Sequence, residues 1–257
     1  MIDSILIPKA HLTPPVVGRH IVLEQLAKSY GDRHAVDGVS LSVAPGEIVG
    51  LLGPNGAGKT TTFYMIVGIV KPSRGRVLLG SEDLTMLPMF KRARLGLGYL
   101  AQEPSIFRRL TVEENVQLIW ELVGVSQEDQ AKRLPPLLAQ FGLTDVARQM
   151  ANTLSGGERR RAELARAFAT DPSFLLLDEP FTGIDPIAIG DIQRILYELK
   201  SKGIGILITD HNVRETLSIT DRAYIINDGR ILVAGTSQEI ADNEIARKHY
   251  LGERFSL

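Results

Sequence analysis

The chain has 257 residues, of which 44% are hydrophobic and 23% are charged, with a formal net charge of -1 and no cysteine. This balance provides no overall field that would hold the protein on nucleic acid or anionic lipid, and the lack of cysteine excludes disulfides and thiolate chemistry. No apolar run approaches the ~20 residues of a membrane-spanning helix, so we expect a cytoplasmic protein. The near-zero net charge leads us to expect no nucleic-acid partner.

The first residues are expected to lie outside the folded domain. Residues 1–19 contain Pro14-Pro15 and lack the basic start of a secretory signal peptide. We interpret them as a flexible extension, and we expect the folded domain to span residues 20–257.

The segment from His20 to Leu52 predicts several strands. Apolar and β-branched runs are separated there by Gly31-Asp32 and Pro45-Gly46, which favour turns. A Gly-rich stretch then opens a helix that we expect Lys71-Pro72 to end. Two further strands, at 76–80 and 95–102, are expected around a short basic helix at 89–96.

The middle of the chain, from Thr111 to Met150, predicts helices. Thr111 and Glu114 form the pattern of a capping box, and the residues that follow have helical apolar spacing. Pro135-Pro136 is expected to break or begin a helix, because proline lacks the N–H and clashes with the preceding turn. We place this helical lobe at about residues 103–165, inserted in the core.

An α/β alternation follows the helical lobe. The apolar run at 174–177 indicates a strand buried on both faces. A helix at 187–202 and a second apolar strand at 204–209 follow it, which implies parallel strands. Residues 223–235 predict a hairpin that turns at Asn227-Asp228-Gly229, and Thr236 with Glu239 forms another capping box.

The stretch "GPNGAGKT" matches the phosphate-binding pattern G-x-x-x-x-G-K-[ST] between a predicted strand and a predicted helix. Its glycines let backbone N–H groups point at phosphates, while Lys59 reaches the outer phosphates and Thr60 can ligate Mg²⁺. The flanking strand and helix argue against the alternative, a chance Gly-rich turn. The predicted nucleotide-binding residues are Gly53, Pro54, Asn55, Gly56, Ala57, Gly58, Lys59, Thr60 and Thr61.

Polar residues follow three of the predicted strands. Asp178 lies where α/β sheets bind ligands and can hold Mg²⁺, and Glu179 is the candidate general base for an attacking water. The alternative is that these two acids cap a helix before Pro180. His211 follows the next strand and is a candidate contact to the γ-phosphate, whereas Gln102 can coordinate Mg²⁺ or water.

A second Gly-rich loop, "LSGGE", opens directly into a helix. Its serine hydroxyl, backbone N–H groups and helix N-terminus suit an anion. The phosphates of the chain's own nucleotide are already held by the first loop. This second loop is therefore expected to serve the nucleotide of another subunit.

Together these motifs resemble the ATP-binding cassette (ABC) ATPase family over residues 20–257. The resemblance implies a P-loop core with an N-terminal antiparallel β subdomain and an inserted helical subdomain. It also implies a homodimer in which two cassettes pack head to tail around two ATP molecules with Mg²⁺. It assigns Tyr30 to stacking on adenine, Lys59 and Thr60 to the Walker A motif, Gln102 to the Q-loop, and Leu154, Ser155, Gly156, Gly157 and Glu158 to the signature. Asp178 and Glu179 fall in Walker B, Asp185 in the D-loop and His211 at the switch histidine, with Thr60, Gln102 and Asp178 around the metal.

Three consecutive arginines, Arg159 to Arg161, follow the signature. Such a run is usually a solvated helix face, and nothing basic continues on either side. We expect these side chains to face solvent and not to bind nucleic acid.

Within the family, "PSIFRRLTVEENV", "DEPFTGIDPI" and the tail "YLGERFSL" look like the ATPase subunits of lipopolysaccharide exporters. That likeness implies a subunit on the cytoplasmic face of the inner membrane. We expect a groove near Phe107 and Arg108 to receive a helix of the membrane subunits, and the alternative is that Phe107 packs inside the helical lobe. The ATPases of branched-chain amino-acid importers and soluble non-transport ABC ATPases remain alternatives. The chain departs from the pattern at Ala101, where proline is expected.

Overall fold

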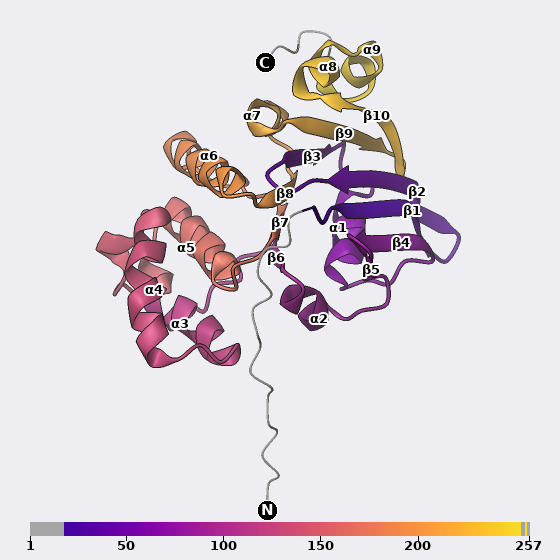
Figure 1. Cartoon of the computed structure of the whole chain (residues 1–257). Coiled ribbons are helices and arrows are strands. Elements are labelled where there is room, and N and C mark those ends of the chain that lie inside the picture. The colour runs from indigo at the N-terminus through magenta and orange to yellow at the C-terminus, as the bar shows by residue number, and fades with distance from the viewer. Residues whose placement is uncertain (1–17, 253–254, 256–257) are drawn as a thin grey trace, which may run out of the picture.

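The computed structural model describes residues 18–252 and residue 255. Residues 1–17 of the expected N-terminal extension lie outside the described residues. The expected α/β class is confirmed, with two sheets and a separate group of helices (Figure 1). Within the described residues, no helix is both long and apolar enough to cross a bilayer.

The larger sheet positions the functional loops. Its strand order is β10-β9-β3-β8-β7-β6, and every neighbouring pair is parallel except the β9–β10 hairpin. The strands are β3 (Ile48–Leu52), β6 (Leu97–Leu100), β7 (Phe174–Asp178), β8 (Gly205–Thr209), β9 (Arg222–Asn227) and β10 (Arg230–Thr236). All residues of β3, β7 and β8 are buried, as expected for parallel strands covered on both faces.

A smaller antiparallel sheet packs beside the larger sheet. Its order is β2-β1-β4-β5, with β1 (Ile21–Tyr30), β2 (Arg33–Val43), β4 (Arg74–Leu79) and β5 (Glu82–Asp83). Apolar side chains of this sheet, of helix α1 (Lys59–Val67) and of one face of the larger sheet form one core, which includes Leu26, Phe63 and Leu207. The N-terminal antiparallel subdomain is therefore confirmed.

The helical lobe packs against the other face of the larger sheet. One continuous core joins Trp120 and Phe141 of the lobe to Leu175 and Ile208 of the sheet.

The remaining helices are α2 (Met89–Arg94), α3 (Val112–Leu122), α4 (Gln127–Gln140), α5 (Gly156–Phe168), α6 (Pro186–Ser201), α7 (Val213–Ile219), α8 (Ser237–Asp242) and α9 (Glu244–Ala246). Short helical turns lie at Thr144–Val146, Ala151–Thr153 and Arg247–Leu251. The capping boxes at the starts of α3 and α8 are both present.

Two helix boundaries differ from expectation. Helix α1 ends at Val67, because Gly68 adopts a left-handed conformation (φ 92°) and its N–H bonds to the carbonyl of Tyr64. Helix α4 is not broken by Pro135-Pro136, which lie inside it. Both prolines are exposed, so water can reach the carbonyls that they leave unpaired, while the buried Leu137 and Leu138 hold the helix on the core.

Replacing both Pro135 and Pro136 by alanine should stabilise the protein, since each proline removes an intrahelical hydrogen bond and neither side chain is buried. We expect the free energy of unfolding to rise by about 2 kcal/mol, the helical gain being reduced by a more flexible unfolded chain. Urea unfolding measures the change. The exposed Lys132→Ala on the same helix is the control and should shift stability by less than ~0.5 kcal/mol. A loss of stability in the double variant would contradict the expectation.

Candidate functional site: a phosphate loop facing a carboxylate cluster

The Gly-rich loop follows β3 and leads into α1. Gly58 caps the helix with φ 107°, and a Cβ there would lie 2.6 Å from the carbonyl oxygen of Ala35. At Gly53 a Cβ would lie 2.1 Å from the carbonyl oxygen of Ile226. Only glycine fits these two positions, so the tight turn of the loop into the helix N-terminus requires glycine at both.

Lys59 is the cation at the centre of this loop. Its side chain is buried, and Nζ donates hydrogen bonds to the carbonyl oxygens of Gly53 (2.6 Å) and Pro54 (3.0 Å). Burial lowers the pKa of Lys59, and the nearby carboxylates of Glu179 and Asp178 partly oppose that shift. The ammonium group therefore lies between the loop and the two acids at the carboxyl end of β7.

A cavity of about 350 Å³ opens above the loop. Of the predicted nucleotide-binding residues it is lined by Tyr30, Asn55, Gly56, Gly58, Lys59, Thr60 and Thr61, together with Glu179 and the unpredicted Arg33 and Ala35. Gly53, Pro54 and Ala57 shape the turn but do not line the cavity. Tyr30 is 52% exposed, with Nζ of Lys28 5.2 Å from its ring centre, so one face of an aromatic ring is available at the cavity mouth.

Asp178 lies at the carboxyl end of β7 and is fully buried. Its Oδ1 accepts a hydrogen bond from the hydroxyl of Thr209 at 2.8 Å, whereas Oδ2 has no hydrogen-bond partner among the described residues. Burial is the main cause that raises the pKa of Asp178. A buried carboxylate oxygen without a donor is costly unless a cation or water meets it.

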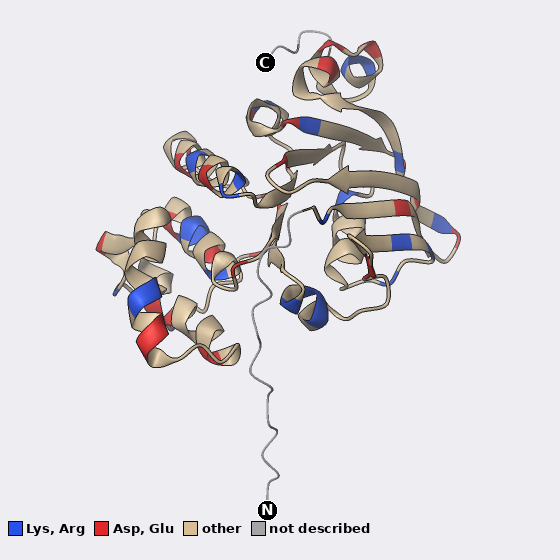
Figure 2. Cartoon of the chain, viewed as in Figure 1, with Lys and Arg blue, Asp and Glu red and all other residues tan. Residues whose placement is uncertain are grey.

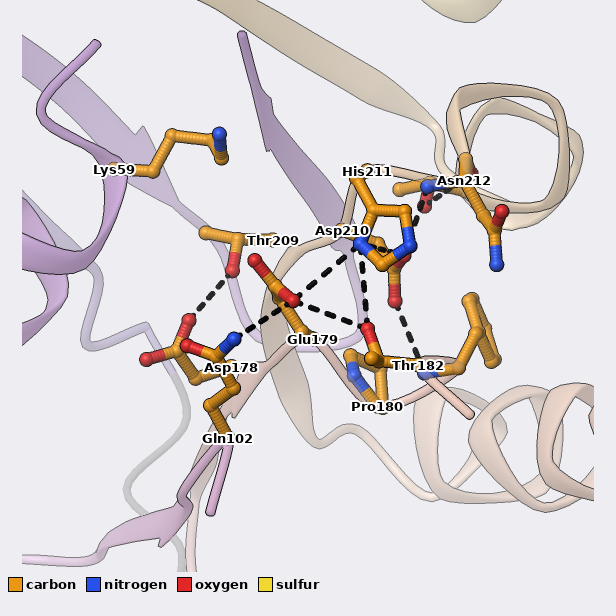
Figure 3. A network of polar contacts seen from close by, with 12 residues as sticks. Lys59, Gln102, Asp178, Glu179, Pro180, Thr182, Thr209, Asp210, His211 and Asn212 are labelled. Carbon is orange, nitrogen blue, oxygen red and sulfur yellow. Dashed lines mark hydrogen bonds and ion pairs between the residues drawn. The ribbon is translucent and has the colours of Figure 1, made fainter. Parts of the chain in front are cut away.

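Glu179 collects the contacts of three neighbouring loops (Figure 3). Its Oε2 accepts hydrogen bonds from Nε2 of Gln102 (3.0 Å) and the hydroxyl of Thr182 (3.1 Å), and lies 3.4 Å from Nδ1 of His211. Its backbone is left-handed (φ 48°), which is unusual for a residue other than glycine. The alternative that these acids cap a helix is wrong, since Asp185 caps the next helix, α6.

Asp210 was not among the predicted site residues. It follows β8 and is fully buried, and its carboxylate accepts hydrogen bonds from the backbone N–H groups of Phe181 (3.0 Å) and Asn212 (2.8 Å). Burial raises its pKa. Asp210 thereby ties the loop of His211 to the loop after Glu179. The signal was present in the sequence, because an acid at the end of a mainly apolar, buried strand is the same pattern that identified Asp178.

The signature loop does not line the cavity above the phosphate loop. Ser155 caps α5 in a capping box, in which Oε2 of Glu158 accepts hydrogen bonds from the N–H (2.9 Å) and hydroxyl (2.6 Å) of Ser155. These bonds lower the pKa of Glu158. The two glycines differ: a Cβ at Gly157 would lie 2.5 Å from Cβ of Ala188, whereas one at Gly156 would approach nothing closer than 3.8 Å.

Asp185 occupies the start of α6. Its Oδ1 accepts hydrogen bonds from the N–H groups of Ile187 and Ala188 at 3.1 and 3.0 Å. Ile187, in the first turn of this helix, is 84% exposed. The signature and Asp185 therefore lie on neighbouring helix starts, joined where Gly157 packs against Ala188.

The expectation that Arg159 to Arg161 face solvent is wrong for all three. Arg160 is only 7% exposed, whereas Arg159 and Arg161 are partly buried, and Arg161 is paired with Asp191 at 3.2 Å. Helical spacing explains the burial of Arg160, because it shares a face with Gly157 and Leu164, both buried.

An apolar groove of about 490 Å³ lies between α2 and the helical lobe. Phe107 lines it and is 46% exposed, so it does not pack inside the lobe. The guanidinium of Arg166 lies 5.2 Å from the Phe107 ring centre and also lines the groove, whereas Arg108 is exposed beside it and does not. Basic residues colour much of the α2 ribbon blue in Figure 2. Among them, Arg92 lines the groove.

Known proteins resemble this chain in sequence and in fold. The LptB lipopolysaccharide export system ATP-binding protein of Acidithiobacillus ferridurans is 54% identical over 234 residues, covering 91% of this chain and 97% of the relative. The crystal structure of the ADP conformation of an ABC transporter cassette matches with a TM-score of 0.81 and 30% identity, covering 91% of this chain and 99% of that one.

A dimeric post-hydrolysis state of another cassette, bound to ADP and phosphate, matches with a TM-score of 0.76 and 26% identity, covering 84% and 98% of the two chains. The family model described as ABC transporter matches residues 36–182, more than half of the chain. The chain belongs to the ABC transporter family, as one of its ATP-binding, ATP-hydrolysing subunits.

Proposed function

We propose that this chain is the ATPase subunit of a lipopolysaccharide exporter, bound to the cytoplasmic face of the inner membrane through separate membrane subunits. The observation that carries this proposal is the 54% identity to an LptB protein along nearly the full length of both chains. The groove beside Phe107 provides a surface on which a membrane subunit could act.

The nucleotide is proposed to bind as Mg-ATP. Tyr30 offers a ring to the adenine, while the phosphate loop and Lys59 surround the phosphates. The unpaired Oδ2 of Asp178 fits a magnesium ion, either directly or through water, with oxygens of Thr60 and Gln102 as further ligands. When bound, the ion would neutralise charge on the transferring phosphoryl group.

Glu179 is proposed to take the proton of the attacking water. Its carboxylate lines the cavity above the phosphate loop, and Gln102, Thr182 and His211 surround Oε2, which restricts its direction. His211 is 52% exposed at its side chain and lies beside Glu179, where it could reach the γ-phosphate.

The working unit is proposed to be a homodimer. Leu154 to Glu158 do not line the chain's own nucleotide cavity, and the N–H groups of Ser155, Gly156 and Gly157 suit a phosphate presented by a second copy. Asp185 and the exposed Ile187 lie on the adjoining helix start. Each ATP would then join the phosphate loop of one copy to the signature loop of the other.

Depletion of this chain in its own cell tests the transported substrate. Newly made lipopolysaccharide should remain in the inner membrane, because its extraction would lose the ATPase, while uptake of branched-chain amino acids continues. Membrane fractionation after pulse labelling and an uptake assay measure the two processes. The opposite result, with uptake lost and lipopolysaccharide reaching the surface, would favour an importer.

Glu179→Gln should stop hydrolysis and trap the dimer. Glutamine keeps the size of the side chain but cannot accept the proton, and loss of a general base costs ~10²- to 10⁴-fold, or about 3–5 kcal/mol of barrier. ATP then remains as the bridge, so the variant should elute as a dimer with ATP and as a monomer with ADP. Lys59→Ala in the same background is the control and should stay monomeric. Hydrolysis near the wild-type rate would show that Glu179 is not the base.

Phe107→Ala should separate hydrolysis from partner binding. Removing a half-exposed ring empties part of the groove, so co-purification with the membrane subunits from detergent extracts should fall while ATP hydrolysis by the isolated protein is kept. Leu122→Ala is a matched control, as it removes an exposed apolar side chain of the helical lobe that does not line the groove. Equal loss of partners in both variants would argue against the groove.

A further inference from the structure

Arg160 is buried in the second turn of α5 and uses its guanidinium group at several backbone oxygens. It donates to the carbonyls of Pro180 (Nε, 3.2 Å), Ala101 (Nη1, 2.9 Å), Asp178 (Nη2, 3.0 Å) and Glu179 (Nη2, 3.1 Å), and to Oε2 of Glu163 (Nη1, 3.1 Å). Only a planar group with several fixed donors can serve so many acceptors at once.

This arrangement is not explained by stability alone. Burial lowers the pKa of Arg160, with Glu163 opposing the shift, and Glu163 is itself only 2% exposed. A buried ion pair often contributes no more to stability than well-packed apolar residues would. A role for Arg160 beyond stability must therefore be sought in the segments whose carbonyl oxygens it bonds.

Three of those oxygens belong to consecutive residues, Asp178, Glu179 and Pro180. The middle residue is Glu179, whose left-handed backbone is a strained conformation for a side chain with a Cβ. Such a conformation persists only where the surroundings hold it. Arg160 bonds the carbonyl before, at and after the strained residue, and the N–H of Glu179 bonds to the carbonyl of Thr209 at 2.9 Å.

The other contacts reach the loop that carries Gln102. Arg160 bonds to Ala101 on one side of Gln102, and Oε1 of Glu163 accepts the N–H of Ser105 (2.8 Å) on the other. The Arg160–Glu163 pair thus joins α5 to the loop whose Gln102 amide donates to Glu179. Both the backbone and the side chain of Glu179 depend on this pair.

We infer that Arg160 is a positioning residue for hydrolysis, which fixes the direction of the Glu179 carboxylate according to where α5 lies. The inference rests on the proposed function, in which Glu179 is the base and Ser155, at the start of α5, contacts the partner's ATP. One helix then contacts the nucleotide of one site and aligns the base of the other. ATP bound at either site would therefore affect hydrolysis at both.

The test compares Arg160→Met and Arg160→Lys with Arg161→Met. ATP affinity should be unchanged in all three, because Lys59 and the phosphate loop are untouched. The single-turnover rate of hydrolysis should fall about 10²-fold in Arg160→Met, the loss typical of a misplaced group. Arg160→Lys keeps the charge beside Glu163 but cannot bridge the carbonyls. Its hydrolysis rate should therefore lie between those of the wild type and Arg160→Met. Arg161→Met removes the pair with Asp191 but leaves the carbonyls of residues 178–180 bonded to Arg160, so it should hydrolyse at the wild-type rate.

A double-mutant cycle with Glu179→Gln distinguishes positioning from general damage. If Arg160 acts through Glu179, Arg160→Met should lower the rate no further in the Glu179→Gln background. Losses that multiply, or ATP affinity lost together with rate, would overturn the inference. Should Arg160→Met fail to fold, Arg160→Lys provides the same cycle.

Different results would refute the role of Glu179 as the base and the role of Arg160 as a positioning residue. Wild-type hydrolysis by Glu179→Gln would refute the proposed base, whatever the arginine does. An inactive Glu179→Gln with a fully active Arg160→Met would refute only the role of Arg160.

Discussion

The site depends on the burial of carboxylates at the ends of two parallel strands. Asp178 is the last residue of β7 and Asp210 directly follows β8, and burial raises the pKa of both. Because the strands are parallel neighbours, their carboxyl ends place both acids at one edge of the sheet. Lys59 is buried beside them, and the loop after β7 must bend sharply to bring Glu179 to the same edge. The hydrogen bonds to Asp178, Glu179 and Asp210 stabilise the negative charge that is gathered at this edge.

Much of this site could be predicted because its signals are local. Apolar runs ending in a polar residue identified β7 and β8, and the phosphate loop is a contiguous pattern. The unpredicted features depend on tertiary contacts. The spacing of Arg160 from Gly157 places it on the buried face of α5. The sequence does not predict that its guanidinium would bond to the carbonyls of residues 178–180 and of Ala101. Helix α4 likewise continues through two prolines because the buried Leu137 and Leu138 compensate for the lost bonds.

The segment from Ala101 to Phe107 links the chemistry to the groove. Gln102 contacts Glu179, while Phe107, only five residues later, lines the surface proposed for the membrane subunits. Ser105 and Ile106 between them are fixed to Glu163. A partner that moved Phe107 would therefore displace a segment that is hydrogen-bonded directly to Glu179, the proposed base.

The two glycines of the signature meet different steric constraints. Gly157 is required by the chain's own packing, since a Cβ there would overlap Ala188. Gly156 has open space around it and an ordinary backbone conformation, so nothing in the described residues forbids alanine at that position. Packing within one copy requires the first glycine in any state of assembly. A steric requirement for the second glycine can come only from a molecule that approaches it from outside the described residues.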